Sequence, residues 1–360
     1  MKISLIVASL FLVNSLGCLA QENTPYVGVK SHVGFIIPHA TVLQSLANST
    51  PWGIGLEAGR VLKSADAWAS CNCFTKVGVG VTYFDFQNPQ ELGQSYNLTM
   101  FGEPYLSFRK NWFITLRGEV GVSYLTKIYD EITNPNNLFF GSSTSFIGLA
   151  SLTLNYRLQE DAILRLSANY NHISNGGIRS PNKGMNFPTL SLGVEKHFGD
   201  QQFPTHARQP GLRVQPWHRY LYLGGSRRSL EANALYKRSS YLNLGIETGA
   251  LRPVSNINGF LAGAELYYNG AKAEQARREN NESVPLRLSL TLGHALVFGK
   301  LSFTQQMGYN AYQPQTTGDK SFFQRYAIYY QLGKLLNAGV SLKVHGHVAD
   351  FIDMRVGIRW

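Results

Sequence analysis

The sequence predicts an all-β chain that crosses a membrane as an antiparallel transmembrane β-barrel of about 16 strands. Apolar and polar residues alternate in segments of about 10 to 14 residues, a length that suits a tilted spanning strand. Short turns such as Gly299-Lys300 alternate with longer polar loops such as 130–137 and 271–283. The chain also stops on Trp360 at the end of a predicted strand. A soluble β-sandwich shows alternation too, but these three features together favour the membrane barrel.

Three segments show the alternation most clearly. Between residues 162 and 174 the even positions are mostly apolar, whereas the odd positions include Arg165 and Asn169. Between 286 and 298 a row of leucines shares one face, and Arg287 lies on the other. From 352 to 360 the even positions are apolar and alternate with Asp353 and Arg355. In a membrane barrel the apolar face of each strand meets lipid and the polar face lines the lumen.

The first twenty residues predict a cleaved signal peptide. Lys2 gives a positive start, an apolar run spans 3–13, and Cys18-Leu19-Ala20 offers a cleavage site before Gln21. A lipoprotein signal with Cys18 as the acylated residue is the alternative. Either signal exports the chain, and no later segment approaches the roughly 20 apolar residues of a spanning helix. An exported barrel of this kind is expected in the bacterial outer membrane.

The chain divides into two halves with eight predicted strands each, one half in residues 21–198 and the other in residues 219–360. Residues 199–218 between them are rich in Pro, Gln, His and Arg and predict a linker or a periplasmic turn. The halves look weakly repeated, because the Gly-x-Glu-x-Gly pattern of 55–59 recurs at 245–249, and Phe198 closes the first half as Trp360 closes the second. One barrel of about 16 strands is favoured, and two tandem eight-stranded barrels also fit.

Composition and charge restrict the function. The chain has 35 Gly, 19 Tyr and 20 Phe and only 15% charged residues, a composition typical of membrane barrels with aromatic belts. The net charge of +11 argues for contact with lipopolysaccharide phosphates, since an exported protein rarely meets nucleic acid. Cys71 and Cys73 are too close for easy disulfide geometry and too sparse for a metal site, so we interpret them as turn residues, with joint oxidation left open.

One stretch carries residues suited to acyl transfer. His172 and Ser174 stand two apart on a predicted strand and therefore project to the same face. A histidine beside a hydroxyl can act as the general base that activates it. Asn175 and the backbone of Gly176 and Gly177 are candidates for oxyanion donors. By parity this pair continues the apolar face, so both polar side chains are expected on the lipid side, where such groups are functional candidates.

This stretch resembles the lipid A 3-O-deacylase (PagL) family of outer-membrane β-barrel hydrolases. The resemblance rests on His172-x-Ser174-Asn175-x-Gly177 and then Pro181-Asn182-x-Gly184, before a strand that ends at Phe198. It implies a serine esterase in which Ser174 is the nucleophile and His172 the base. The family's third member is a Glu, whereas Asn186 stands at that position here. Asn186 can orient His172 but cannot stabilise an imidazolium with a full charge, and the acidic alternative Glu195 has the opposite parity.

The resemblance implies a hydrolase that removes an ester-linked acyl chain from lipid A without a metal or an organic cofactor. Lipid A or lipopolysaccharide would be the substrate, and outer-membrane lipids and the barrel assembly machinery the partners. The alternative is a non-catalytic barrel, either a channel or a structural protein, that retains a degenerate motif, because about 16 strands leave room for an aqueous lumen.

Overall fold

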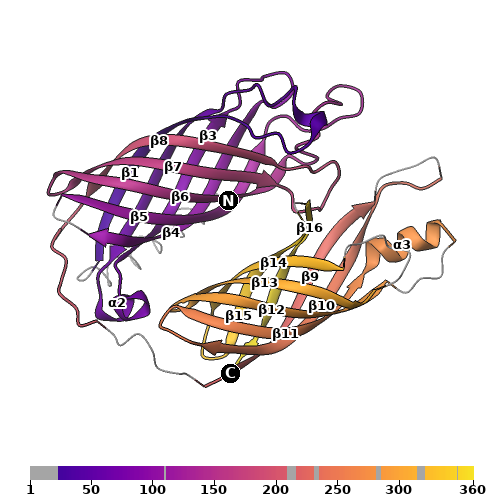
Figure 1. Ribbon diagram of the computed structural model, residues 1–360. Helices are drawn as coiled ribbons and strands as arrows, with labels where there is room; N and C mark the ends of the chain where they lie inside the picture. Colours follow the sequence, from indigo (N-terminus) through magenta and orange to yellow (C-terminus); the bar gives the residue numbers. More distant parts are fainter. Residues whose placement is uncertain are drawn as a thin grey trace, which may run out of the picture. The chain divides into compact units, whose positions relative to one another are not determined.

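The computed structural model describes residues 23–108, 111–208, 216–230, 235–280, 285–313, 321–346 and 348–360. The predicted signal peptide, residues 1–20, lies outside these ranges. In the described part of the chain, no helix is long and apolar enough to cross a membrane. Strands dominate the described part (Figure 1).

Sixteen strands are present in the described residues, as the sequence predicts. The first eight are β1 (Asn23–Gly34), β2 (Trp52–Leu62), β3 (Thr75–Asp85), β4 (Gln94–Phe108), β5 (Trp112–Leu125), β6 (Thr144–Gln159), β7 (Ala162–Ser174) and β8 (Met185–His197). The second eight are β9 (His218–Leu230), β10 (Ser239–Pro253), β11 (Asn258–Asn269), β12 (Leu286–Phe298), β13 (Leu301–Tyr312), β14 (Phe322–Gln331), β15 (Leu336–His345) and β16 (Val348–Arg359). A 3₁₀ helix, η1 (Thr41–Leu43), follows β1, and α2 (Ala65–Cys71) follows β2. The third helix, α3 (Gly270–Arg278), overlaps the predicted loop 271–283.

The strands form two closed barrels of eight, not the single barrel that the sequence favoured. The first barrel closes because β1 pairs antiparallel with β8, from Tyr26↔His197 to Gly34↔Thr189. The second closes in the same way, because β16 pairs with β9. An eight-stranded barrel has an interior just wide enough for side chains to fill.

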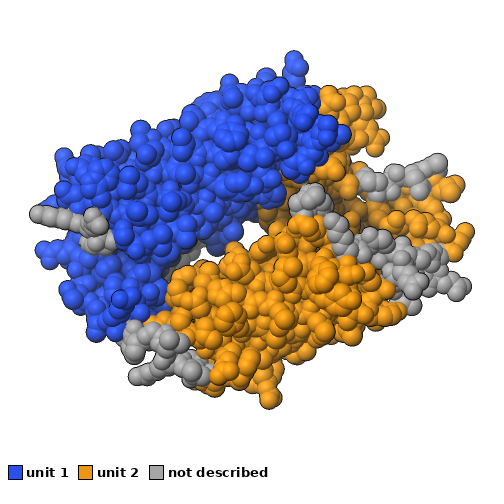
Figure 2. Space-filling model, viewed as in Figure 1, with its two compact units in different colours: residues 1–126, 147–173, 185–208 blue, residues 127–146, 174–184, 209–360 orange. Residues whose placement is uncertain are grey.

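By compactness the chain forms two units, coloured separately in Figure 2. The first unit holds residues 1–126, 147–173 and 185–208. The second holds residues 209–360 together with two segments that follow β5 and β7, namely residues 127–146 and 174–184.

The predicted alternation is confirmed on both faces of the strands. On β7, Asn169 and Asn171 are buried inside, whereas Leu166 and Tyr170 are about half exposed on the outside. On β16, Asp353 and Arg355 are buried and the alternate apolar residues are exposed. The exposed apolar side chains therefore form the surface that meets lipid, and the polar ones line the lumens.

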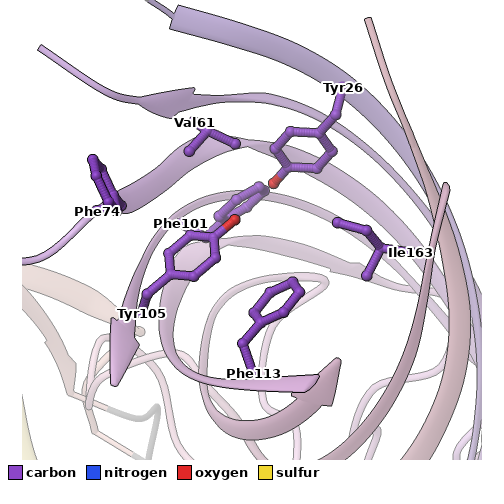
Figure 3. Close-up of a cluster of buried hydrophobic side chains, with 7 residues drawn as sticks. All are labelled: Tyr26, Val61, Phe74, Phe101, Tyr105, Phe113 and Ile163. Carbon is purple, nitrogen blue, oxygen red and sulfur yellow. The ribbon is translucent and has the colours of Figure 1, made fainter. Parts of the chain in front are cut away.

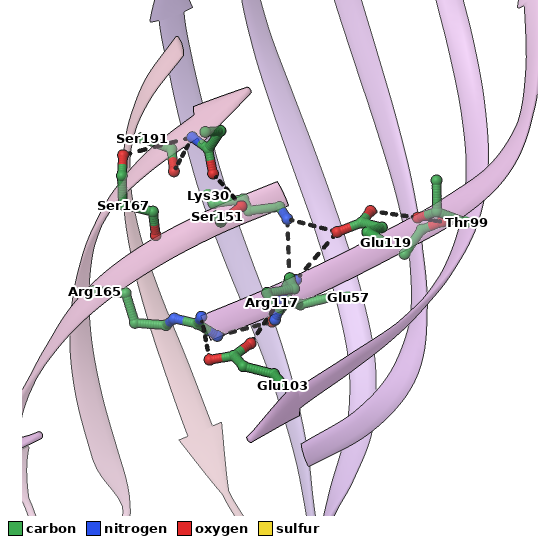
Figure 4. A network of polar contacts seen from close by, with 12 residues as sticks. Lys30, Glu57, Thr99, Glu103, Arg117, Glu119, Ser151, Arg165, Ser167 and Ser191 are labelled. Atoms are coloured by element: carbon green, nitrogen blue, oxygen red, sulfur yellow. Dashed lines mark hydrogen bonds and ion pairs between the residues drawn. The ribbon is translucent and has the colours of Figure 1, made fainter. Parts of the chain in front are cut away.

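A network of buried charges fills the first lumen (Figure 4). Arg117 bonds to Glu57 at 2.6 Å and to Glu103 at 2.6 Å, and Arg165 bonds to Glu103 at 2.7 Å. Four cations and four carboxylates make up the described network: Lys30, Lys76, Arg117, Arg165, Glu57, Glu103, Glu119 and Glu195. Their charges balance, which is the condition under which buried ions are tolerated.

Aromatic residues close the lumen of the first barrel at its turn end, the end at which short turns such as residues 160–161 connect the strands (Figure 3). Tyr105 stacks on Phe113 with ring centroids 5.1 Å apart, and Tyr26 stacks on His197 at 5.0 Å. Phe203, from the predicted linker, packs edge-on against Phe74 at 4.7 Å. The first lumen is thus occupied by ion pairs in its middle and by rings at this end.

The second lumen repeats this design with other residues. Arg325 bonds to Glu265 at 2.5 Å, and Arg355 bonds to Glu265 at 2.7 Å and to Glu247. Three cations and three carboxylates form the described network: Arg325, Lys343, Arg355, Glu247, Glu265 and Asp353. Tyr222 stacks on Tyr329 near the turn end, with centroids 4.3 Å apart.

The two halves are related in register as well as in pattern. Tyr26 on β1 lies opposite Gly59 on β2, and Tyr220 on β9 lies opposite Gly249 on β10. The closing aromatics match as well. The Phe198 N–H donates to the carbonyl of the residue before Tyr26 at 2.8 Å, and the Trp360 N–H donates to the carbonyl before Tyr220 at 3.0 Å. The weak repeat in the sequence therefore corresponds to equivalent positions in two barrels.

Cys71 and Cys73 are joined by a disulfide bond at the C-terminal end of α2. The helix begins after Ser64, whose hydroxyl accepts from the Ala67 N–H at 3.3 Å, and ends at Asn72, which is left-handed with φ 53°. The left-handed residue turns the chain back so that the two sulfurs meet. The interpretation as plain turn residues is corrected to a disulfide-linked helix end, and joint oxidation is confirmed.

Candidate functional site

The pairing of β7 with β8 places His172 directly opposite Asn186. Residues opposite each other in an antiparallel pair share a face, and this face is the outer one, because the neighbouring Asn171 and Ile173 are buried inside. The extension of β1 adds a third member to the row, since Ile37 forms a bridge with Asn186 and its N–H donates to the Asn186 carbonyl at 2.9 Å. Three chain segments thus fix the position of Asn186.

His172 and Asn186 are joined by a side-chain hydrogen bond. The Nδ1 atom of His172 lies 2.6 Å from the Oδ1 atom of Asn186. An amide oxygen accepts only, so the ring nitrogen donates, and the proton sits on Nδ1 in the neutral ring. The other nitrogen, Nε2, then carries the lone pair that a general base needs. The sequence assigned Asn186 the task of orienting His172, and the structure brings these two side chains together.

Ser174 is the last residue of β7, two positions beyond His172. Strand geometry directs their side chains to the same face. Within the described residues no hydrogen bond joins His172 to Ser174. Catalytic hydrogen bonds are often long in an enzyme without substrate, so the separation leaves Ser174 as a candidate.

The segment after β7 is held by its own asparagines. The Asn175 N–H donates to Asn182 Oδ1 at 3.0 Å, and the Asn175 side-chain amide donates to the Arg179 carbonyl at 2.7 Å. The Gly177 N–H donates to Asn175 Oδ1 at 3.1 Å. Gly176 and Gly177 have φ of 62° and 79°, a left-handed conformation that favours glycine.

These bonds distinguish the proposed oxyanion donors that are already hydrogen-bonded from those that are not. The N–H groups of Asn175 and Gly177 are already engaged within the segment. The Gly176 N–H has no acceptor in the described part of the chain, and the Asn175 amide has a second hydrogen beyond the one given to Arg179. Those two groups are the better candidates for oxyanion donors. The family resemblance points to residues 175–177 as a whole. The hydrogen bonds of the structure show which of their N–H groups are already engaged.

Glu195 is excluded as the acidic partner of His172. It is buried in the lumen, where Lys76 lies 2.9 Å from it and His197 Nε2 lies 3.0 Å from it, and it also pairs with Arg165. This confirms the parity argument from the sequence. Asn182 and Ile37 are the contributors that residue-level reasoning did not assign. Asn182 was visible only as part of the family pattern, and Ile37 had no local signal because its pairing with β8 is long-range.

The surroundings of the site are apolar. On the outer face beside His172 and Asn186, Phe35, Tyr170 and Leu190 are about half exposed or more. Among the described residues there is no cluster of three or more His, Cys, Asp or Glu side chains that could hold a metal. The site therefore consists of a polar row at the edge of an apolar surface.

Each half of the chain matches a model of a known protein family. The family model for lipid A 3-O-deacylase (PagL) matches residues 53–195, and the model for the acyloxyacyl hydrolase C-terminal domain matches residues 216–360. A comparison with curated proteins gave no match.

Three solved structures are among those similar to this chain. Neisserial surface protein A is 14% identical (TM-score 0.35; 48% of this chain, 97% of the other). The outer membrane enzyme PagL is 16% identical (TM-score 0.33; 46% and 97%). The N-terminal β-barrel domain of Pseudomonas aeruginosa OprF is 10% identical (TM-score 0.29; 48% and 97%). With both of its halves matched by family models, the chain belongs to the PagL lipid A deacylase and acyloxyacyl hydrolase family of bacterial outer-membrane β-barrel proteins.

Proposed function

We propose that this protein is an outer-membrane serine esterase that hydrolyses an ester-linked acyl chain of lipid A. The observation that carries the proposal is the hydrogen bond of 2.6 Å between His172 and Asn186 on the outer face of β7 and β8. A histidine oriented in this way, two residues before a serine on the same strand, has the arrangement of an activated nucleophile. Its place on the lipid side favours a lipid ester over a soluble substrate.

The position along the strand supports the same substrate. His172 lies at the end of β7 that leads into the long segment 175–184, whereas the turn before β7 is only residues 160–161. Outer-membrane barrels have short periplasmic turns and long outer loops. The proposed site therefore lies at the level of the outer leaflet, where lipid A and its ester bonds are found.

The proposed reaction has two steps. Ser174 Oγ attacks the ester carbonyl carbon while His172 Nε2 takes the hydroxyl proton, and the resulting oxyanion accepts hydrogen bonds from Gly176 N–H and Asn175 Nδ2–H. The intermediate collapses to an acyl-serine, and the departing alcohol receives the proton from His172. Water then attacks the acyl-serine with His172 again as base, which releases the fatty acid and restores Ser174. Asn186 holds the ring throughout but supplies no charge.

Replacement of Ser174 tests the proposal. Lipid A from cells that express the wild type is expected to lose one acyl chain in mass spectra, and lipid A from cells with Ser174→Ala is expected to keep it. Ser167→Ala is the matched control, because Ser167 lies on the same strand but faces the lumen, where it accepts from Thr153 at 2.9 Å. Identical spectra from the wild type and Ser174→Ala would falsify the esterase assignment.

Two further expectations stay proposals. We place the domain bounds at 21–198 and 219–360, with 199–218 as the linker after a signal peptide at 1–20. We also expect the barrel assembly machinery to recognise the terminal strand that ends at Trp360.

A further inference from the structure

The two closing strands of the second barrel pair over only part of their length. The pairing of β16 with β9 runs from Arg359↔Tyr220 to Met354↔Gly225. Yet β9 continues to Leu230 and β16 begins at Val348. Each strand keeps its other neighbour along this stretch, since β9 pairs with β10 as far as Leu230↔Ser239, and β16 pairs with β15 as far as His345↔Val348. We call the stretch of 226–230 and 348–353, where the two strands do not pair with each other, the seam.

An unpaired seam is costly in a membrane barrel. Backbone N–H and C=O groups that face lipid have no water to bond with, and closed barrels exist because closure removes such edges. The seam therefore needs another partner for its backbone groups. An ion pair between side chains joins the two strands across the seam, because Arg228 on β9 lies 3.1 Å from Asp350 on β16, but it does not bond the backbone groups.

The segment that follows His172 and Ser174 supplies the backbone partner. The Ile352 N–H on β16 donates to the Gly176 carbonyl at 2.9 Å, and the Ser229 N–H on β9 donates to the Ile178 carbonyl at 3.0 Å. Residues 176–178 thus bond to both edges of the seam. All these residues belong to the second compact unit.

The fit of this segment explains why two glycines stand in it. A Cβ atom on Gly176 would lie 2.4 Å from the Ile352 side chain, and one on Gly177 would lie 2.2 Å from the Asp350 carbonyl oxygen. Both residues also have positive φ. Any larger residue would therefore clash with β16 as well as strain the backbone.

We propose that β9 and β16 form a docking seam that holds segment 175–178 and so positions the oxyanion donors of the esterase site. The catalytic consequence of this docking rests on the proposed function, whereas the docking itself does not. Ser229 and Ile352 act through their backbone N–H groups, and neither touches substrate in this scheme.

A proline at Ser229 tests the docking in the full-length protein. The Ser229 N–H points to Ile178 and away from β10, so Ser229→Pro removes the seam bond without removing a ladder bond. Ser229→Ala is the matched control, because it also removes the hydroxyl contact with Ser240 but keeps the N–H. Heat-modifiable migration on gels checks that each variant has folded.

Hydrogen exchange and deacylation are measured on the same purified samples. In the wild type we expect the amides of Ser229 and Ile352 to be protected. In Ser229→Pro we expect the amides of Asn175 and Gly177 to exchange about tenfold faster and the deacylation rate to fall about tenfold, with Ser229→Ala unchanged in both.

The outcomes separate the two proposals. Wild-type amides at 229 and 352 that exchange as fast as open loops overturn the docking, even if the proline variant does not fold. Exchange in 175–177 that the proline leaves unchanged overturns it as well. A wild type that shows the expected exchange but never deacylates lipid A supports the docking and overturns the esterase.

Discussion

The Nδ1 atom of His172 and the Oδ1 atom of Asn186 lie 2.6 Å apart on adjacent strands, on the membrane-facing side of the first barrel. An amide here keeps the geometric half of a catalytic acid's task, since it fixes the ring and its tautomer. It omits the electrostatic half, because it carries no charge to stabilise the imidazolium of the proposed mechanism. Substitutions at Asn186 can separate these two contributions, the orientation of the ring and the stabilisation of its charge.

Asn186→Leu and Asn186→Asp are expected to change the deacylation rate in opposite directions. The leucine removes the hydrogen bond and frees the ring, and we expect kcat to fall about 10- to 100-fold. The aspartate keeps the length and adds a charge, and because charge-assisted hydrogen bonds are about twice as strong, we expect kcat to rise. Initial rates on lipid A in detergent micelles measure both.

The heat-modifiable migration of each variant serves as the folding control for this comparison. A leucine variant as active as the wild type would show that the bond between His172 and Asn186 does not contribute to catalysis.

The faces of the strands were readable from the sequence because they follow from local periodicity, and the candidate site residues were placed by the same parity. Parity alone put His172 outside and Glu195 inside, and the structure agrees. The same rule does not decide which strand closes on which. The pairing of Tyr26 with His197 joins residues from opposite ends of the first half, and nothing local distinguishes it from a continued sheet of 16 strands.

In the sequence, the signals for two barrels were the linker of residues 199–218 and the aromatic Phe198. Phe198 occupies the place in the first barrel that Trp360 occupies in the second, each bonded to the carbonyl before a tyrosine on the first strand. The docking of segment 175–178 could not be predicted from the sequence either, because the seam that holds it depends on long-range pairing in the other half of the chain.

Glu103→Gln is expected to destabilise the first barrel strongly. Glu103 is fully buried and contacts Arg117 at 2.6 Å, Arg165 at 2.7 Å and Lys76 at 3.1 Å. Its neutral replacement leaves a net positive charge among these cations in the lumen. Removing one partner of a buried ion pair costs about 3–5 kcal/mol, and we expect a loss of that order in the free energy of unfolding.

Denaturant titration in lipid vesicles measures the change. Asp161→Asn is the control, because Asp161 and Lys196 form an ion pair at 2.5 Å in which both side chains are well exposed. We expect no measurable change there, since solvent screens exposed pairs. Equal effects of the two substitutions would show that the buried network does not support the barrel.

The purified protein is expected to show no steady conductance in planar bilayers. The first lumen holds the balanced ion network, with Tyr26, Tyr105 and Phe113 packed near one end. The second holds Arg325, Arg355 and their carboxylates. Open-channel currents whose amplitude is reproducible and whose frequency rises with protein concentration would favour the channel alternative over the enzyme.

Gly59→Ala and Gly249→Ala are expected to destabilise their barrels to a similar degree, because they occupy equivalent positions. A Cβ on Gly59 would lie 2.6 Å from the Val77 carbonyl oxygen and 3.0 Å from the Tyr26 ring. On Gly249 it would lie 2.3 Å from the Ala262 carbonyl oxygen and 2.5 Å from the Tyr220 hydroxyl. Such overpacking costs about 1–3 kcal/mol.

Gly118→Ala on β5 is the control for this pair, because a Cβ there meets nothing within 4 Å. Peptide-resolved hydrogen exchange under denaturant assigns each loss to its barrel, with Gly59→Ala expected to loosen β1–β8 and Gly249→Ala expected to loosen β9–β16. If only one of the two substitutions destabilises its barrel, the Tyr-Gly contact is not an equivalent packing element in both halves. The two barrels would then share the backbone pairing of Tyr with Gly but not its contribution to stability, because the close contact between ring and glycine would stabilise only one of them.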